Sequence, residues 1–275
     1  MTAASGRPGT ASASRAPGPA DQTAEVSWFD TRAISLSGSD LAELDAREKA
    51  RAAAFVFPSD RHRYEVAHVM LRRVLAGHLG TDPSRLTFGR QQCPTCGGPS
   101  GKPILTGLQG AAEEPSPPGD GSWPGLSFSL AHSGEAVAIA VARGPVGIDV
   151  EREPDGCVCS LASAMHPNDA ALAEALPEPE RHHAVIRWWV RAEAVLKCAG
   201  TGIAHGMDAF PVLGAPVRSR VPPLGPRLPL EPDMPGWAAA AGCSFAALSA
   251  PKGYQAALAL PGLRMIRYRG GSDGR

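Results

Sequence analysis

The 275-residue sequence lacks the features that mark several classes of protein. No apolar run approaches the roughly 20 residues that a membrane-spanning helix needs. Residues 1–24 are rich in Ala, Ser, Gly and Pro and contain no apolar core of a secretory signal. Basic and acidic residues number 27 each, so the formal net charge of +0 gives no general attraction to nucleic acid or anionic membranes. We therefore expect neither a nucleic-acid partner nor a membrane partner, and any anion site must be local.

Cysteine is also scarce, because six residues in a chain of this length do not make a disulfide scaffold. This composition predicts reduced thiols and a cytoplasmic location. Cys93 and Cys96 lie in a Cys-x-x-Cys-Gly sequence that resembles half of a zinc knuckle, but Cys157 and Cys159 have the wrong spacing to complete it. Two reduced thiols in a turn are thus favoured over a zinc module that binds nucleic acid.

The sequence has enough apolar residues for a substantial core, since 43% are hydrophobic. Its 31 Gly and 27 Pro residues also require many loops. Residues 1–24 are low in complexity and are expected to be disordered. Residues 106–124 are interpreted as a surface insertion and residues 217–236 as a Pro-rich loop.

Apolar periodicity predicts a mixture of helices and short strands. The predicted helices cover 41–55, 59–79, 167–176 and 181–199, and the predicted strands cover 25–34, 86–91, 135–142, 208–217, 243–248 and 254–260. Residues 128–134 are predicted as a loop that contains His132. The similar stretches 134–140 and 253–259 form a faint internal repeat, which predicts two α+β units that meet near residues 143–147 with a ligand cleft between them.

Two groups of charged residues are candidates for chemistry. Asp149 and Glu151 are two positions apart at the end of an apolar strand, so their side chains lie on one face, roughly 6–7 Å apart. Such carboxylates repel each other, and a divalent cation such as Mg²⁺ relieves the repulsion. Glu193 and Lys197 are neighbours at i and i+4 on a predicted helix, beside its apolar stripe. The alternative interpretation is that both groups are solvated surface charges.

Four motifs in order resemble those of the 4′-phosphopantetheinyl transferases of the surfactin-synthetase-activating (Sfp) type. They are Gly101-Lys102-Pro103, Ser129-Leu130-Ala131-His132-Ser133, Val146-Gly147-Ile148-Asp149-Val150-Glu151, and the stretch from Trp189 to Gly202. The upstream pattern of Phe55, Asp60, Arg63 and Arg72 also fits, and the resemblance covers about 25–262. It implies an α+β fold of two pseudo-symmetric halves, 25–144 and 145–265, each with a helix packed on a small antiparallel sheet. Residues 266–275 are then a flexible tail.

The resemblance also implies an activity and a set of site residues. The group transferred is 4′-phosphopantetheine, which passes from coenzyme A to a serine of an apo acyl or peptidyl carrier protein in polyketide, non-ribosomal peptide or fatty acid synthesis. Mg²⁺ is expected on Asp149, Glu151 and Glu193, with Glu193 also taking the serine proton and Lys197 assisting the leaving phosphate. The residues expected to bind coenzyme A are Arg51, Arg63, Lys102, His132, Ser133 and Lys197. Because one chain contains both halves, we expect a monomer.

Several positions depart from the family pattern. Ala192 stands where many members have Lys, Ser129 and Ala131 replace the usual Asn and Ser, and Asp169 lies where Glu is common. The carboxylates, Lys102, His132 and Lys197 are all present, which favours an active enzyme. The alternative is a non-catalytic relative that binds coenzyme A on the same fold.

Overall fold

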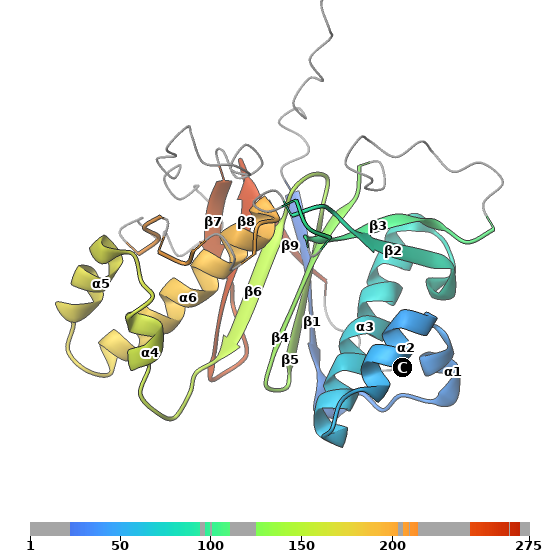
Figure 1. Ribbon diagram of the computed structural model, residues 1–275, viewed down its shortest axis with the longest axis horizontal. Coiled ribbons are helices and arrows are strands. Elements are labelled where there is room, and N and C mark those ends of the chain that lie inside the picture. The colour runs from blue at the N-terminus through green and yellow to red at the C-terminus, as the bar shows by residue number, and fades with distance from the viewer. Residues whose placement is uncertain are drawn as a thin grey trace, which may run out of the picture.

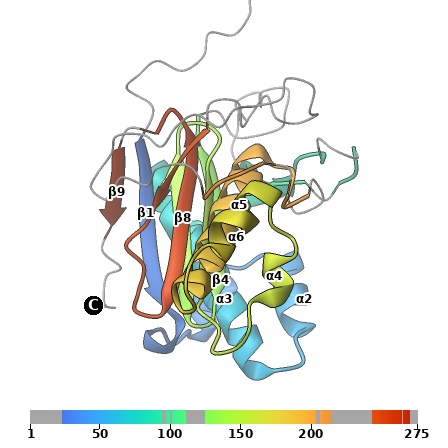
Figure 2. The same ribbon diagram turned by 90° about the vertical axis from the view of Figure 1, so that its left-hand side faces the viewer.

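The computed structural model describes residues 23–93, 97–99, 101–110, 125–202, 206–208, 210–213, 243–263 and 265–269. It confirms the α+β class, with helices lying on one side of the strands (Figures 1 and 2). Residues 1–22 of the predicted tail 1–24, most of the insertion and the loop 217–236 lie outside the described residues, whereas residues 23 and 24 belong to strand β1 rather than to a tail. Within the described part of the chain, no helix is long and apolar enough to cross a membrane.

The described strands form three sheets. A four-stranded sheet has the order β4-β5-β1-β9, a three-stranded sheet has the order β6-β8-β7, and β2 pairs with β3. Their bounds are β1 Thr23–Asp30, β2 Leu86–Arg90, β3 Pro103–Leu108, β4 Ser127–Ser133, β5 Ala136–Ala142, β6 Gly147–Arg152, β7 Cys243–Ala247, β8 Tyr254–Pro261 and β9 Met265–Arg269. All pairs are antiparallel except β1 with β9, so the last strand of the chain runs parallel to the first.

Two long helices each cover one of the larger sheets. The helices are α1 Gly38–Ala42, α2 Ala46–Ala53, α3 Pro58–Leu79, α4 Cys159–Ala162, α5 Pro167–Glu174 and α6 Glu180–Ala199, with short 3₁₀ turns at Thr31–Ala33 and Pro83–Arg85. Helix α3 packs against β4 and β5, and α6 packs against β6, β7 and β8. Both long helices end at a glycine in the left-handed region, Gly80 with φ 62° and Gly200 with φ 80°, where a residue without Cβ is favoured.

The single helix predicted over 41–55 is two helices. Ser37 and Asp40 form a capping box that begins α1, and Asp45 and Glu48 form a second box that begins α2. Each box satisfies backbone N–H groups that a helix start leaves without partners. The second cap therefore interrupts a pattern that apolar periodicity alone reads as continuous.

The two larger sheets meet side by side along β4 and β6 (Figure 1). Serine hydroxyls of β4 join these strands, since Ser129 Oγ accepts from Ile148 N and Ser133 Oγ accepts from Arg152 N, each at 3.1 Å. On its other side, β6 presses against α6. A Cβ built on Gly147 would lie 1.9 Å from the Ala194 carbonyl oxygen, so only glycine permits this approach. Strand β6 is thus fixed between the first sheet and the second helix.

The structure corrects several predictions. Residues 127–133 form strand β4 rather than a loop, because their backbone pairs antiparallel with β5 over its whole length. The described part of 208–217 contains no strand. Residues 106–108 belong to β3, and residues 266–269, assigned to a tail, lie in β9.

The expectation of reduced thiols is also wrong at one place. Cys157 and Cys159 form a disulfide with their Cα atoms 5.5 Å apart, a separation within the range that a disulfide bridges. Cys93 is buried, whereas Cys96 lies outside the described residues, so the predicted turn of two thiols is not described in full.

Candidate active site

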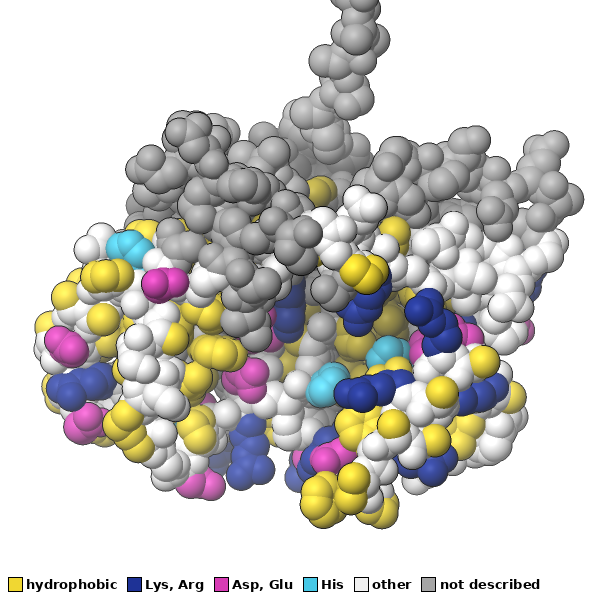
Figure 3. All heavy atoms as spheres, viewed as in Figure 1, with side chains coloured by type: hydrophobic (Ala, Val, Ile, Leu, Met, Phe, Trp, Pro, Cys, Tyr) yellow, Lys and Arg dark blue, Asp and Glu magenta, His cyan; other side chains and the backbone are white. Residues whose placement is uncertain are grey.

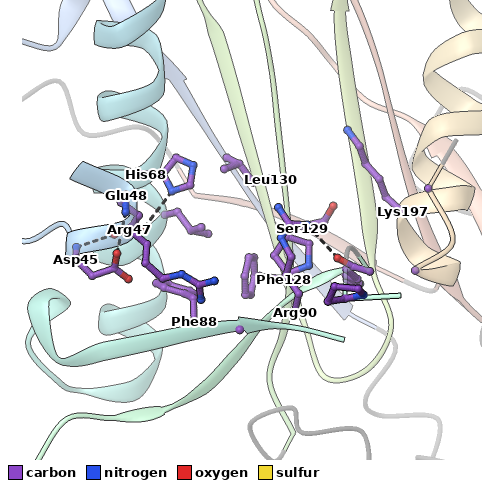
Figure 4. A pocket seen from close by; sticks show the side chains of 18 of the residues that line it. Asp45, Arg47, Glu48, His68, Phe88, Arg90, Phe128, Ser129, Leu130 and Lys197 are labelled. Carbon is purple, nitrogen blue, oxygen red and sulfur yellow. Dashed lines mark hydrogen bonds and ion pairs between the residues drawn. The ribbon is translucent and has the colours of Figure 1, made fainter. Parts of the chain in front are cut away.

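A cleft of about 690 Å³ lies between α2 and α3 on one side and the end of α6 on the other. The space-filling view shows a hollow at this place with Lys, Arg and His side chains around it (Figure 3). Side chains of α2 and α3 line one side, β4 lies in the middle, and Lys197 projects from α6 on the other side (Figure 4). The cleft is large enough for a nucleotide-sized ligand.

Asp149 and Lys197 meet at the α6 side of this cleft. Asp149 is 3% exposed, and its Oδ1 accepts a hydrogen bond from Lys197 Nζ at 2.6 Å. Burial raises the pKa of Asp149 to about 7, although the Lys197 charge acts to lower it. The second oxygen, Oδ2, is buried and has no hydrogen-bond partner among the described residues. A buried oxygen without a partner is costly unless another group, such as a cation, binds it.

Glu151 and Glu193 lie near Asp149. For Glu151, strand alternation predicts this placement. The negative charges of both glutamates contribute to the raised pKa of Asp149. Glu193 is buried on α6, and burial, opposed by Lys197, raises the pKa of its carboxyl. Glu151 is half-buried, and its Oε2 accepts from Ser133 Oγ at 2.6 Å. Ser133 therefore positions a carboxylate.

The three acids fit a hard cation by their chemistry but are not gathered around one point. Within the described residues, no group of three His, Cys, Asp or Glu side chains is close enough to hold a metal ion. The Lys197 ammonium instead balances the charge of Asp149. The available donors are carboxylate oxygens, including the partnerless Asp149 Oδ2, and these are the ligand type that Mg²⁺ prefers.

The other predicted binding residues take different positions. Lys102 lines the cleft, but its Nζ donates to the Val146 carbonyl at 2.6 Å, and burial lowers its pKa. His132 lies on β4, and its side chain is exposed. Neighbouring protein atoms remove part of the water around its ring, which lowers its pKa, and nearby positive charges lower the pKa further. Arg63 pairs with Asp60 and Glu135, and Arg51 lies over the Phe55 ring. Neither arginine is among the residues that line the cleft.

Sequence reasoning missed three basic side chains that line the cleft: Arg47, His68 and Arg90 (Figure 4). Arg47 is exposed at the start of α2, and Arg90 is exposed at the end of β2. His68 stacks on Tyr64 with ring centroids 4.1 Å apart. No spacing rule joins these residues, because they come from three elements and meet only through tertiary folding.

Aromatic and aliphatic side chains provide an apolar surface in the same cleft. Phe88 of β2 and Phe128 of β4 contact edge to face with centroids 5.7 Å apart, and Tyr64 and Leu71 of α3 lie nearby in the lining. Burial raises the pKa of Tyr64 to about 12, so its phenol stays neutral. An apolar aromatic surface beside cations suits a ligand with a flat ring and phosphates.

The departures from the family pattern have local explanations. Ala192 of α6 is fully buried in the core and does not line the cleft. The replacement of the usual lysine by alanine therefore removes no side chain from the cleft lining. Arg191 turns away and donates to the Val212 carbonyl at 3.1 Å. Asp169 is fully buried and accepts from the backbone N–H groups of Val212 and Leu213, at 2.7 and 2.9 Å. Asp169 thus anchors a loop.

Comparison with known proteins shows which family the chain resembles. Residues 145–221 match the family model described as the 4′-phosphopantetheinyl transferase superfamily. The 4′-phosphopantetheinyl transferase HetI of Nostoc sp. is 32% identical over 198 residues, which cover 70% of this chain and 75% of that protein. A 4′-phosphopantetheinyl transferase of Bacillus subtilis is 25% identical over 183 residues, covering 66% and 72%. The transferase Sfp of Bacillus subtilis strain 168 is 24% identical over 168 residues, covering 61% and 64%.

Proposed function

The chain belongs to the 4′-phosphopantetheinyl transferase superfamily, and we propose that it moves 4′-phosphopantetheine from coenzyme A to a serine of an apo acyl or peptidyl carrier protein. The reaction is a displacement at phosphorus: the serine oxygen bonds to the β-phosphorus of coenzyme A, and adenosine 3′,5′-bisphosphate leaves. The serine proton passes to a base, and the leaving phosphate takes the negative charge. A site for this reaction needs an anion cleft, a base and a cationic group beside the leaving phosphate.

The observation that carries this proposal is the Asp149–Lys197 pair at one end of a cleft of about 690 Å³. The half-buried Lys197 side chain brings its ammonium to the cleft wall. There it would hold the pyrophosphate and stabilise the charge that builds on the leaving group. Helix α6 thereby supplies the Lys197 cation, and strand β6 supplies the carboxylates, to one ligand.

The remaining lining suits coenzyme A. The apolar surface formed by Phe88 and Phe128 would accept the adenine ring, and Arg47 and Arg90 would attract the nucleotide phosphates. Such local charges explain how a chain of zero net charge binds a polyanion. Lys102 and His132 would also bind phosphate oxygens of coenzyme A. Lys102 must first release the Val146 carbonyl, to which its Nζ now donates.

Glu193 is the proposed base for the serine proton. Its burial raises the pKa of its carboxyl, which makes the ionised form a stronger base than an exposed glutamate. Asp149, Glu151 and Glu193 would also hold Mg²⁺, which when bound neutralises charge on the phosphate oxygens. Ser133 would keep Glu151 oriented through its 2.6 Å hydrogen bond.

The test is incubation of the full chain with coenzyme A, Mg²⁺ and each of several apo acyl and peptidyl carrier proteins, followed by intact-mass measurement of the carrier. We expect a gain of one phosphopantetheine group on at least one carrier, and the set of carriers modified identifies the pathway class. Reactions without coenzyme A or with EDTA are the controls. Calorimetric binding of coenzyme A with no mass gain on any carrier would instead establish the non-catalytic relative.

A further inference from the structure

The junction between α2 and α3 exposes two adjacent apolar side chains. Val56 is 86% exposed and Phe57 is 65% exposed, the highest values among the large hydrophobic side chains of the described residues. Phe57 also occupies the N-cap position of α3 without a side-chain cap, a position that polar residues usually fill. We call Val56 and Phe57 the apolar tip. Neither burial nor helix capping within this chain accounts for these residue types.

A row of cations leads from the cleft to the apolar tip. Arg47 and Arg51 are at i and i+4 on α2, and Phe55 continues the row, with the Arg51 guanidinium 5.1 Å from its ring centroid. Within the described residues neither arginine forms an ion pair with a carboxylate. Like charges at this spacing destabilise a helix slightly, and the contact of Arg51 with Phe55 offsets part of that cost. In the space-filling view, hydrophobic side chains at the lower end of these helices lie below Lys and Arg side chains (Figure 3).

The apolar tip is continuous with the proposed reaction site. The second turn of α3, five residues after the helix begins, is tied to the β4–β5 hairpin by the 2.7 Å ion pair of Arg63 with Glu135. At the same hairpin, Ser133 bonds to Glu151, one of the proposed metal ligands. A protein seated on the tip therefore lies along the same rim of the molecule as the carboxylates that must meet its serine.

We propose that the apolar tip and its arginine row form the docking surface for the acceptor protein, which presents an apolar side chain framed by carboxylates near its serine. This inference rests on the proposed transfer reaction. The chemistry follows from complementarity, since a positive row beside two apolar side chains matches an acidic surface with an apolar centre. Two side chains provide far less than the roughly 1,200–2,000 Å² of a stable interface, which suits a substrate that must leave after each turnover.

The test is steady-state kinetics of the double variant Val56→Ser, Phe57→Ser with coenzyme A and the best apo carrier from the panel. We expect the KM for the carrier to rise at least tenfold, while the KM for coenzyme A and the thermal melting temperature stay the same. The matched control is Leu172→Ser on α5, which replaces another exposed apolar side chain, 49% exposed, in the other half of the chain. Its carrier KM should not change.

The possible results separate the two proposals. An unchanged carrier KM in the double variant, with an active parent chain, overturns the docking surface alone. A parent chain that modifies no carrier overturns the transfer reaction and the docking surface together. A change in sedimentation coefficient between the parent chain and the double variant would assign the tip to contact between copies of this chain, which also overturns the proposal.

Discussion

Lys197 on α6 and Asp149 on β6 are 48 residues apart in sequence and are joined by a 2.6 Å hydrogen bond between Nζ and Oδ1. The pair links the helix of the second half to the strand that borders the first sheet. It also holds opposite charges that would otherwise be isolated in a protein interior, where an unpaired charge is costly. The proposed chemistry depends on this link, because it fixes where the ammonium and the carboxylate face the cleft.

Lys197→Ala should lower kcat for transfer by about 100-fold, because the cation beside the leaving phosphate is lost. It should also raise the pKa of Asp149 above about 7, since Lys197 lowers that pKa against the effect of burial. Carrier mass assays and a carboxyl NMR titration of the metal-free protein measure the two effects. Lys252→Ala removes an exposed lysine before β8 and should leave both unchanged. An equal loss in both variants would refute the role of Lys197.

Glu193→Gln should abolish transfer while the fold stays intact. The substitution keeps the size of the side chain but removes the proton acceptor and one proposed metal ligand. Single-turnover mass measurements test activity, and circular dichroism tests the fold. Glu180→Gln, in the exposed first turn of the same helix, is the matched control and should retain full activity. Full activity of Glu193→Gln would remove Glu193 from the mechanism.

Arg90→Ala should raise the KM for coenzyme A about tenfold, equivalent to about 1.4 kcal/mol of binding free energy. The expected cause is the loss of one cation at the cleft. The effect should shrink at high salt, because ions screen an exposed charge. Arg187→Ala on the outer side of α6 is the control. An unchanged KM for coenzyme A in Arg90→Ala would remove Arg90 from the binding site.

Gly147→Ala should destabilise the protein by about 1–3 kcal/mol and reduce transfer, because the new methyl group forces β6 and α6 apart. Its Cβ would meet Ala194 O at 1.9 Å and Cys198 N at 2.4 Å. Urea unfolding measures the change in the free energy of unfolding. Gly77→Ala is the opposite control, since this exposed position in α3 has nothing within 4 Å and should stabilise the helix by about 0.5–1 kcal/mol. An unchanged free energy of unfolding in Gly147→Ala would show that β6 and α6 separate easily.

Glu48→Gln should cost stability in a pH-dependent way. Burial acts to raise the pKa of Glu48, but hydrogen bonds from His68, Arg72 and the Asp45 backbone outweigh it and lower the pKa below its ordinary 4.5. The stabilisation by the charged form is therefore present above pH 4.5 and is lost as pH falls through the folded-state pKa. Urea unfolding should show a deficit of roughly 3 kcal/mol at pH 7 that shrinks below pH 4.5. Glu174→Gln, at an exposed position, should show no such deficit.

Sequence patterns predicted the parts of the fold that depend on local order. The long helices α3 and α6 and their glycine ends follow from apolar spacing and from the left-handed conformation that glycine adopts readily. The side-by-side placement of Asp149 and Glu151 follows from strand alternation. The family was identified because its motifs consist of these same local patterns.

Other features depend on contacts between distant residues and could not be predicted in this way. Strand β9 is exposed along much of its length and carries little apolar alternation, so its pairing with β1 has no sequence signal. Arg47 of α2 and Arg90 of β2 line one cleft, although no local pattern brings these two elements together. The hydrogen bond from Lys102 to Val146 likewise depends on the approach of two loops.

The parallel pairing of β9 with β1 means that the polypeptide closes on itself. Residues 265–269 complete the sheet that residues 23–30 begin, after the chain has formed α6 and the sheet of β6, β7 and β8. A fragment that ends near residue 144 would thus expose an edge of β1 that the intact chain covers, and exposed edges promote aggregation. For anyone dividing this protein, the strand formed by residues 265–269 is a structural neighbour of the first strand.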